Sequence, residues 1–193
     1  MKAGDSIFIA AGGTGGHTYP ALAISEEFQK EGINIYWIGS LGGIEKKLVS
    51  DKNIKFLGMP VVGYRSKSKL KIIYSIFMAV VSTFFSLFLI FKIQPKLVIG
   101  MGGYVSGPIG LAAILARTKL VIHEQNAVPG FTNRILYKFA NIVFEGFPDT
   151  FKSRETIYSG SPVRKEIWSA NKKNAKKCER QNRILILGGS TGA

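Results

Sequence analysis

Residues 6–27, SIFIAAGGTGGHTYPALAISEE, join an apolar run to a helical pattern through four glycines within five residues. The run at 7–11 predicts a buried strand, and Pro20 marks the expected start of the helix. Glycines let the backbone approach a phosphate closely, and the N–H groups of a first helical turn have no intrahelical partners. The stretch therefore predicts an anion-binding turn, with a plain tight connection of an α/β protein as the alternative.

The same turn narrows the class of nucleotide that it can bind. A P-loop continues with Gly-Lys-Ser/Thr, whereas Gly16 is followed by His17 and Thr18, so ATP hydrolysis is not expected. The dinucleotide pattern G-x-G-x-x-G starts at Gly13 but has Thr18 in place of its third glycine, and the apolar run at 33–38 ends in Gly39 and Ser40 without the ribose-binding acid. An NAD-type oxidoreductase stays as an alternative. His17 is either a catalytic candidate at the edge of an anion site or an ordinary surface histidine.

Apolar runs alternate with helical patterns along the rest of the chain. Further strands are expected at 33–38, 54–59, 97–99, 119–123, 142–145 and 156–159. Helices are expected at 44–49, with its charges outward, and at 72–91, 109–116 and 132–140. This alternation predicts an α/β fold, a Rossmann-like doubly wound parallel sheet that binds ligands beyond the carboxyl ends of its strands.

A second glycine loop, GMGGYVSGP at 100–108, follows another predicted strand, and HEQN at 123–126 ends the next one. Two glycine loops in one sheet predict two anionic groups, or one diphosphate held from two sides. Glu124 and Asn126 could bind sugar hydroxyls at the same crevice, or they could simply form a turn capped by the asparagine.

The chain is strongly basic, with 26 Lys and Arg against 12 Asp and Glu and a formal net charge of +14. This balance favours an anionic partner, which could be a nucleic acid, a phosphate-bearing substrate or an anionic membrane, although compositional drift is an alternative. Four of the cations lie close together in one loop, at Arg65, Lys67, Lys69 and Lys71.

Residues 72–91 follow that basic loop and contain no charge over twenty positions. Small residues recur at helical spacing, at Ser75, Ala79, Ser82 and Ser86, and this stripe predicts close packing against another element. Three alternatives stay open: a sheet-packed helix with one face in the membrane interface, a wholly buried core helix, and a transmembrane span. The flanking lysines favour the first alternative.

The carboxyl-terminal segment changes in composition. Residues 165–182 are rich in Lys, Asn and Gln and are expected to form a basic linker. Residues 183–193 repeat the opening scheme of an apolar run and a glycine loop, so they are expected to start a second domain that is absent here. The single Cys178 allows neither a disulfide nor a cysteine-based metal site within the chain, and the amino terminus resembles no secretory signal.

Five motifs occur in an order that resembles the MurG family of glycosyltransferases. They are GGTGGHTYP at 12–20, GMGGYVSGP at 100–108, HEQN at 123–126, PVR at 162–164 and GGSTGA at 188–193. The resemblance covers essentially the whole chain and implies the GT-B architecture of two Rossmann-like domains. Residues 1–164 would form the amino-terminal acceptor and membrane domain. Ser161 departs from the asparagine that usually precedes Pro-Val-Arg in this family.

The resemblance implies an inverting transfer of N-acetylglucosamine from UDP-N-acetylglucosamine to the C4 hydroxyl of a lipid-linked N-acetylmuramoyl-pentapeptide. This step belongs to peptidoglycan synthesis and hence to cell wall biogenesis, cell shape, cell division and the cell cycle. The implied location is peripheral, on the cytoplasmic face of the inner membrane, with an anionic membrane surface as a partner and no nucleic acid. A non-catalytic module that binds the lipid diphosphate is the alternative, and the 193 residues alone are expected to be inactive.

The resemblance also assigns roles to individual residues. His17 would be the catalytic base. The donor-contacting positions are Thr14, Gly15, Gly16, Asn126, Arg164 and Ser190. The acceptor-contacting positions are Gly102, Gly103, Tyr104, Ser106 and Glu124, and the membrane contacts are Arg65, Lys67, Lys69 and Lys71. No cofactor is expected, and no metal either, because Asp5, Asp51 and Asp149 form no Asp-x-Asp pair.

Overall fold

Seven parallel strands form one sheet in the computed structural model, which describes residues 1–50, 52–63, 69–152, 155–167 and 169. The strand order is β3-β2-β1-β4-β5-β6-β7. The strands are β1 (Ser6–Ala10), β2 (Asn34–Ser40), β3 (Lys55–Met59), β4 (Leu97–Gly100), β5 (Leu120–Glu124), β6 (Ile142–Glu145) and β7 (Ile157–Tyr158). All six neighbouring pairs run parallel. The predicted strands are therefore confirmed to within a residue or two at each end.

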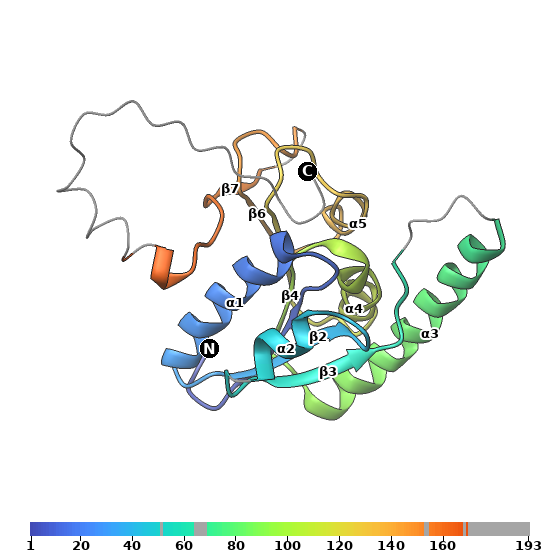
Figure 1. The fold of residues 1–193 in the computed structure, drawn as a ribbon, viewed down its shortest axis with the longest axis horizontal. Helices are drawn as coiled ribbons and strands as arrows, with labels where there is room; N and C mark the ends of the chain where they lie inside the picture. The colour runs from blue at the N-terminus through green and yellow to red at the C-terminus, as the bar shows by residue number, and fades with distance from the viewer. Residues whose placement is uncertain (51, 64–68, 153–154, 168, 170–193) are drawn as a thin grey trace.

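Helices cover both faces of this sheet (Figure 1). They are α1 (Gly15–Lys30), α2 (Glu45–Ser50), α3 (Lys69–Ile93), α4 (Gly103–Leu115) and α5 (Phe131–Leu136). Successive residues of a strand point to opposite faces, so Ile7 and Ile9 of β1 belong to one apolar core with Leu22 of α1. Phe8 of β1 belongs to the other core, together with Ile109 of α4. The sheet is thus buried on both sides, as parallel sheets usually are.

The order of the strands creates a switch point between β1 and β4. The chain moves outward from β1 to β3 and then returns through α3 to β4 on the other side of β1. Consequently α1 and α4, which follow these two neighbouring strands, leave toward opposite faces of the sheet (Figure 1). The expected Rossmann-like doubly wound fold is confirmed, and its expected ligand-binding edge lies at this switch point.

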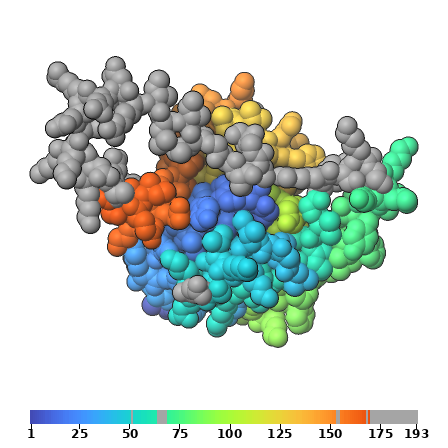
Figure 2. All heavy atoms as spheres, in the orientation of Figure 1, coloured from blue at the N-terminus to red at the C-terminus, as the bar shows by residue number. Residues whose placement is uncertain are grey.

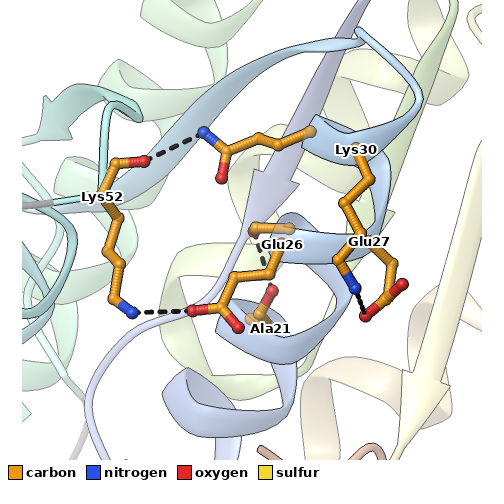
Figure 3. Close-up of polar contacts among 7 residues, drawn as sticks. Ala21, Glu26, Glu27, Lys30 and Lys52 are labelled. Carbon is orange, nitrogen blue, oxygen red and sulfur yellow. Dashed lines mark hydrogen bonds and ion pairs between the residues drawn. The ribbon is translucent and has the colours of Figure 1, made fainter. Parts of the chain in front are cut away.

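Polar contacts tie the outer side of α1 to the turn between α2 and β3 (Figure 3). Lys52 Nζ lies 2.8 Å from Glu26 Oε1, and the Gln29 side-chain amide donates to the Lys52 carbonyl oxygen at 2.9 Å. The side-chain hydrogen bond with Glu26 raises the pKa of Lys52. A second ion pair, Lys30–Glu27, spans three residues of α1 on the exposed side. Exposed pairs of this kind add little stability, so the apolar packing holds α1 in place.

Two helices start earlier than the sequence indicated. α1 begins at Gly15 and contains Pro20, whereas Pro20 was the expected start. α4 begins at Gly103 rather than near 109, so most of the predicted second glycine loop is the first two turns of a helix. Each proline is the sixth residue of its helix, where the missing N–H removes one backbone hydrogen bond. Only residues 101–102 form the turn between β4 and α4.

α3 packs on α4 with one side and is exposed on the other. Ser82 and Ser86 of the small-residue stripe are fully buried, whereas Phe84 and Phe88 on the opposite side are 68% and 58% exposed. In Figure 2 the green atoms of α3 form the right edge of the molecule. The alternative of a wholly buried core helix is therefore wrong. α3 is also longer than the predicted 72–91, and α5 ends at Leu136 instead of 140.

One expectation about the helix at 44–49 is wrong, and another, about residues 165–193, falls largely on residues that the structure does not describe. The helix at 44–49 was expected to carry its charges outward, and this is wrong for Glu45, which is fully buried while Lys46 and Lys47 are exposed. The expected second-domain start at 183–193 and most of the expected linker at 165–182 lie outside the described residues.

Candidate active site

The turns that follow β1 and β4 meet at the switch point. A side-chain carbon added to Gly103 would lie 2.9 Å from the carbonyl oxygen of Gly12, so the two turns are in direct backbone contact. Gly13, Gly102 and Gly103 have φ values of +91°, +89° and +75°, a region that favours glycine. The predicted meeting of two glycine turns in one crevice is therefore present, and glycine is needed there for both space and conformation.

The start of α1 presents free backbone N–H groups to this crevice. Thr14 is the N-cap residue in an extended conformation, and its side chain makes no capping hydrogen bond. Its carbonyl oxygen accepts from the backbone N–H groups of His17 and Thr18, each at 3.2 Å. The N–H groups of Gly15 and Gly16 lie in the first turn, which has no intrahelical acceptors for them. Three of the predicted donor-contacting residues thus form one site suited to an anion.

His17 stands between the two turns and is bonded to the end of β5. Its Nδ1 lies 3.0 Å from Gln125 Oε1, while Gln125 Nε2 donates to the His123 carbonyl oxygen at 3.3 Å. Because that carbonyl can only accept, the Gln125 amide nitrogen must face it and its oxygen must face His17. The imidazole therefore carries its hydrogen on Nδ1. This arrangement leaves Nε2 as the acceptor, which is the form required of a general base.

The imidazole of His17 also packs on the second glycine turn. A side-chain carbon on Gly102 would lie 3.0 Å from His17 Cε1, and one on Gly103 would lie 3.4 Å from Cδ2. His17 is partly buried in this position. A larger residue at 102 or 103 would displace the ring, so these glycines contribute to its placement.

Glu124 organises the turn that follows β5. Its carboxylate is buried and accepts four hydrogen bonds, two from Asn126 at 3.0 and 2.8 Å and one each at 3.0 Å from the Gly130 N–H and Asn133 Nδ2. Both oxygens are thereby occupied within the chain. The predicted contact of Glu124 with the acceptor stays a prediction, and the structure gives this residue a clear role in holding Asn126 at the exposed end of the turn.

Two residues of the site had no assigned role in the sequence analysis. Gln125 lies inside the HEQN motif, so its place beside other polar residues was a usable signal. Asn133 had no such signal, because it falls in an ordinary amphipathic helix. It is fully buried, and its Nδ2 donates to the His123 carbonyl oxygen and to Glu124. Among the described residues its Oδ1 has no hydrogen-bond partner.

His123 is buried beneath the same turn. Its Nε2 lies 2.9 Å from the Gly160 carbonyl oxygen, which can only accept, so Nε2 carries the hydrogen. Its Nδ1 is buried and has no partner in the part of the chain that the structure describes. Burial lowers the pKa of His123, although the hydrogen bond with Gly160 and the nearby Glu124 act in the opposite direction. This histidine is consequently a structural link between β5 and the segment after β7.

Arg164 returns to the start of α1. Its guanidinium carbon lies 4.4 Å from the centre of the Tyr19 ring, and a side-chain carbon on Gly15 would lie 3.2 Å from the same ring. The stacked guanidinium therefore adds a positive charge near the helix start. Ser190, the remaining predicted donor contact, lies outside the described residues.

Tyr104 and Ser106 are placed differently within α4. The Tyr104 ring covers Gly13 and Gly63, where added side-chain carbons would lie 2.8 and 3.1 Å from it. Ser106 is fully buried, and its hydroxyl lies 3.0 Å from the Ala10 carbonyl oxygen and 2.7 Å from that of Gly102. Ser106 thus lies between the end of β1 and the turn before α4. Its predicted contact with an acceptor is untested.

The predicted membrane contacts are only partly described. Lys69 and Lys71 are exposed in the first turn of α3, whereas Arg65 and Lys67 lie outside the described residues. α3 is long and apolar enough to cross a bilayer, with a mean hydropathy of 2.3 over eighteen residues, of which 28% are buried in the protein. Length and composition alone do not distinguish a span from an interfacial helix.

The fold and the paired glycine turns define a Rossmann-like domain with a crevice suited to anions, and comparison with known proteins gives the family. Residues 7–145 match the glycosyltransferase family 28 N-terminal domain, and the chain belongs to this family. Its similarity extends to a particular group of enzymes. It is 43% identical over 190 residues to the UDP-N-acetylglucosamine–N-acetylmuramyl-(pentapeptide) pyrophosphoryl-undecaprenol N-acetylglucosamine transferase of Coxiella burnetii, and 45% identical over 193 residues to that of Pseudomonas fluorescens.

These alignments cover 97% and 98% of this chain but 53% of each relative, so the chain spans about half the length of the curated relatives that it matches. Among solved structures, MurG of Acinetobacter baumannii superposes with a TM-score of 0.76 and 34% identity, over 96% of this chain and 52% of that one. The Neisseria meningitidis UDP-GlcNAc 2-epimerase superposes with a TM-score of 0.62 at 14% identity, which shows a shared fold alone. The resemblance to the MurG family is confirmed, and the chain corresponds to about half the length of these proteins.

Proposed function

We propose that this chain supplies the acceptor-binding half of an inverting glycosyltransferase of peptidoglycan synthesis. The enzyme would transfer N-acetylglucosamine from UDP-N-acetylglucosamine to the C4 hydroxyl of an N-acetylmuramoyl-pentapeptide carried on undecaprenyl diphosphate. The names of the relatives at 43% and 45% identity support this substrate pair. Because the chain spans about half of each, a non-catalytic module that binds the lipid diphosphate is the second candidate.

The position of His17 is the observation that carries the catalytic proposal. Its Nδ1 is committed to Gln125, so Nε2 is available to accept the proton of the attacking hydroxyl. In the proposed step the C4 oxygen forms a bond to the anomeric carbon of the donor from the face opposite UDP. The bond from that carbon to the diphosphate oxygen breaks, and UDP departs with the electron pair. Attack from the opposite face inverts the anomeric centre.

The two glycine turns suit the two diphosphates of this reaction. The start of α1, with Gly15, Gly16 and the nearby Arg164, would oppose the negative charge that develops on the departing UDP. The turn before α4, at Gly102 and Gly103, would hold the diphosphate of the lipid-linked acceptor. We further propose that the reaction needs no metal ion, because these backbone dipoles and the guanidinium supply the positive field.

The exposed side of α3 is the proposed contact with the membrane. Phe77, Phe84, Phe88 and Phe91 are each at least 58% exposed, and Lys69 and Lys71 flank them at the amino end of the helix. An apolar face next to cations supplies the two contributions to binding at an anionic membrane, which are burial of apolar area and electrostatic attraction to the lipid headgroups. We infer a peripheral location on the cytoplasmic face of the inner membrane, where the undecaprenyl tail stays in the bilayer while the sugar reaches the crevice.

Replacement of His17 by alanine tests the catalytic proposal. The chain is assayed together with the carboxyl-terminal half of the Pseudomonas fluorescens relative, and Lys30→Ala at the far, exposed end of α1 is the matched control. We expect His17→Ala to lower kcat about 100-fold or more, with little change in the affinity for UDP-N-acetylglucosamine. Lys30→Ala should behave as the parent.

The outcome separates the two candidate functions. Turnover by His17→Ala within a few-fold of the parent would remove this residue from the chemistry. If the parent pair binds the lipid-linked acceptor but forms no product, the non-catalytic module is the better description.

A further inference from the structure

Glu45 is a buried carboxylate for which the proposed chemistry has no use. It is the first residue of α2 and is fully buried. Its Oε1 accepts from the backbone N–H of Ser40 at 2.8 Å and from the Ser40 hydroxyl at 2.9 Å. Its Oε2 is buried without a hydrogen-bond partner among the described residues, and neither of the ion pairs described involves it. A buried carboxylate oxygen left in this state costs free energy, so its retention calls for a reason.

Three glycines leave room for this carboxylate directly behind the first glycine turn. A side-chain carbon on Gly43 would lie 2.1 Å from both carboxylate oxygens, and one on Gly12 would lie 2.6 Å from Oε1. A carbon on Gly39 would lie 2.8 Å from Glu45 Cγ. The turn after β1, the strand β2 and the loop before α2 therefore close around a single side chain. Gly12, which contacts the carboxylate, is also the residue whose carbonyl oxygen meets the second glycine turn.

A chain of hydroxyl groups extends from Glu45 to α4. The Tyr104 hydroxyl donates to Ser40 Oγ at 3.3 Å, and the Ser40 hydroxyl donates to Glu45 Oε1. Glu45 Oε1 is the acceptor here, because it also accepts from the backbone N–H of Ser40, so the serine uses its single hydrogen toward it. The tyrosine hydroxyl is left to donate to the serine. At the other end of this chain, the Tyr104 ring lies on Gly13.

We propose that Glu45 is a positioning residue, which acts through Ser40 to hold the Tyr104 ring across the first glycine turn and so fixes the relative placement of the two diphosphate-binding turns. The inference rests on the proposed function in taking the turn at Gly102 and Gly103 as a diphosphate site. Glu45 itself touches no substrate, because both its oxygens are covered. Its effect reaches the site through the ring of Tyr104, which is the second residue of α4 and immediately follows Gly103.

The test is a nuclear magnetic resonance titration of the 193-residue chain with geranyl diphosphate, a soluble isoprenyl diphosphate. The backbone amide signals of Gly13, Gly102 and Gly103 report both the geometry of the turns and the Kd. We expect Ser40→Ala and Tyr104→Phe each to raise the Kd about 3- to 10-fold. The double variant should be no weaker than either single variant, because both changes break one chain of hydrogen bonds.

Two substitutions at Glu45 separate loss of the hydrogen-bond acceptor from loss of the carboxyl group as such. Glu45→Gln keeps an acceptor for Ser40 and should retain the parental Kd. Glu45→Leu removes the acceptor and should weaken binding as Ser40→Ala does. Tyr158→Phe, at an exposed tyrosine of β7, is the matched control and should leave the Kd unchanged.

Several outcomes would overturn the proposal. These are a Ser40→Ala variant with the parental Kd, multiplicative losses in the double variant, or equal losses in Glu45→Gln and Glu45→Leu. If the parent itself binds no geranyl diphosphate, the acceptor site of the proposed function is overturned instead. The positioning role is then decided by the chemical shift of the Gly13 amide, which should change to the same new value in Ser40→Ala and in Tyr104→Phe. An unchanged chemical shift would refute the positioning role.

Discussion

Gln125 determines which nitrogen of His17 can act as a base. A glutamine amide has a donor end and an acceptor end, and the His123 carbonyl oxygen holds the donor end. The acceptor end is then presented to His17 Nδ1 at 3.0 Å. Gln125 is neutral, and it fixes the tautomer of the His17 imidazole. A carboxylate in the same place would fix the tautomer too, but it would also stabilise the charged imidazolium. The backbone of β5 thus orients the proposed base through one intervening side chain.

His123 makes stability depend on pH at the residue scale. Its pKa is lowered by burial in the folded state, whereas in the unfolded chain it is near the ordinary value of about 6.5. Its contribution is therefore intact above pH 6.5 and is lost as the pH falls below it, because only the unfolded chain then takes up the proton. We expect the free energy of unfolding of the parent to fall more steeply between pH 7 and pH 5 than that of His123→Gln. The difference in slope should be at most about 1.4 kcal/mol per pH unit.

Urea denaturation at several pH values measures this difference. All other titrating groups are common to the two proteins, so subtraction of the two curves isolates His123. Parallel curves would mean that the buried histidine exchanges protons equally in the folded and unfolded chains.

At the scale of elements, α3 has two chemically distinct sides. Serines at 82 and 86 let it approach α4 closely, while its phenylalanines face outward. Apolar residues in and just after α5, which also packs on α4, are exposed, with Phe131 at 78% and Phe139 at 59%. The crevice at the start of α4 is thus flanked by two helices with exposed apolar residues, a suitable arrangement for a substrate with a lipid tail.

We expect Lys69→Gln/Lys71→Gln to weaken binding to vesicles that contain anionic lipid by about 2 kcal/mol, at roughly 1 kcal/mol per charge near the surface. The matched control is Lys46→Gln/Lys47→Gln, which removes two exposed charges from α2 on the opposite face of the sheet. The same change at all four basic positions, 65, 67, 69 and 71, should cost up to about 4 kcal/mol. Vesicle sedimentation gives the affinities, and added salt should weaken the parent similarly, because exposed charges are screened beyond ~8 Å.

Equal losses in the two double variants would mean that net charge alone drives binding. Extraction by carbonate or high salt supports peripheral attachment. Release by detergent alone would mean that residues 72–91 span the membrane.

The sequence predicts well those elements whose amino-acid composition differs clearly from that of their surroundings. A strand buried on both faces is a continuous apolar run, which is why the sheet was predictable. The helix starts at Gly15 and Gly103 were not predictable, because a glycine-rich sequence is compatible both with a turn and with the first turn of a helix. The burial of Glu45 was missed for a different reason. Acidic residues are rarely buried without a partner, and one of the glycines that enclose this one, Gly12, comes from a distant segment.

At the scale of the whole molecule, strand order brings the site together. Gly13, Gly102 and Gln125 are far apart in sequence, and they meet because β1, β4 and β5 are neighbours in the sheet. The carboxyl ends of these strands form one edge, so each following turn adds groups to one crevice. The described part of this crevice supplies a proposed base, two helix starts and one guanidinium. Proposed donor contacts such as Ser190 lie outside it.

We expect a polypeptide of these 193 residues, assayed by itself, to bind the lipid-linked acceptor without transferring N-acetylglucosamine to it. Transfer needs the donor held against the acceptor and the charge of departing UDP opposed from both sides, and each such group typically supplies a few kcal/mol. The relatives are about twice as long, so half of their groups have no counterpart in this polypeptide. Addition of the carboxyl-terminal half of the Pseudomonas fluorescens relative should restore product formation from radiolabelled UDP-N-acetylglucosamine, and the same half added to His17→Ala should not. Transfer by the 193 residues alone would show that one Rossmann domain suffices for both substrates.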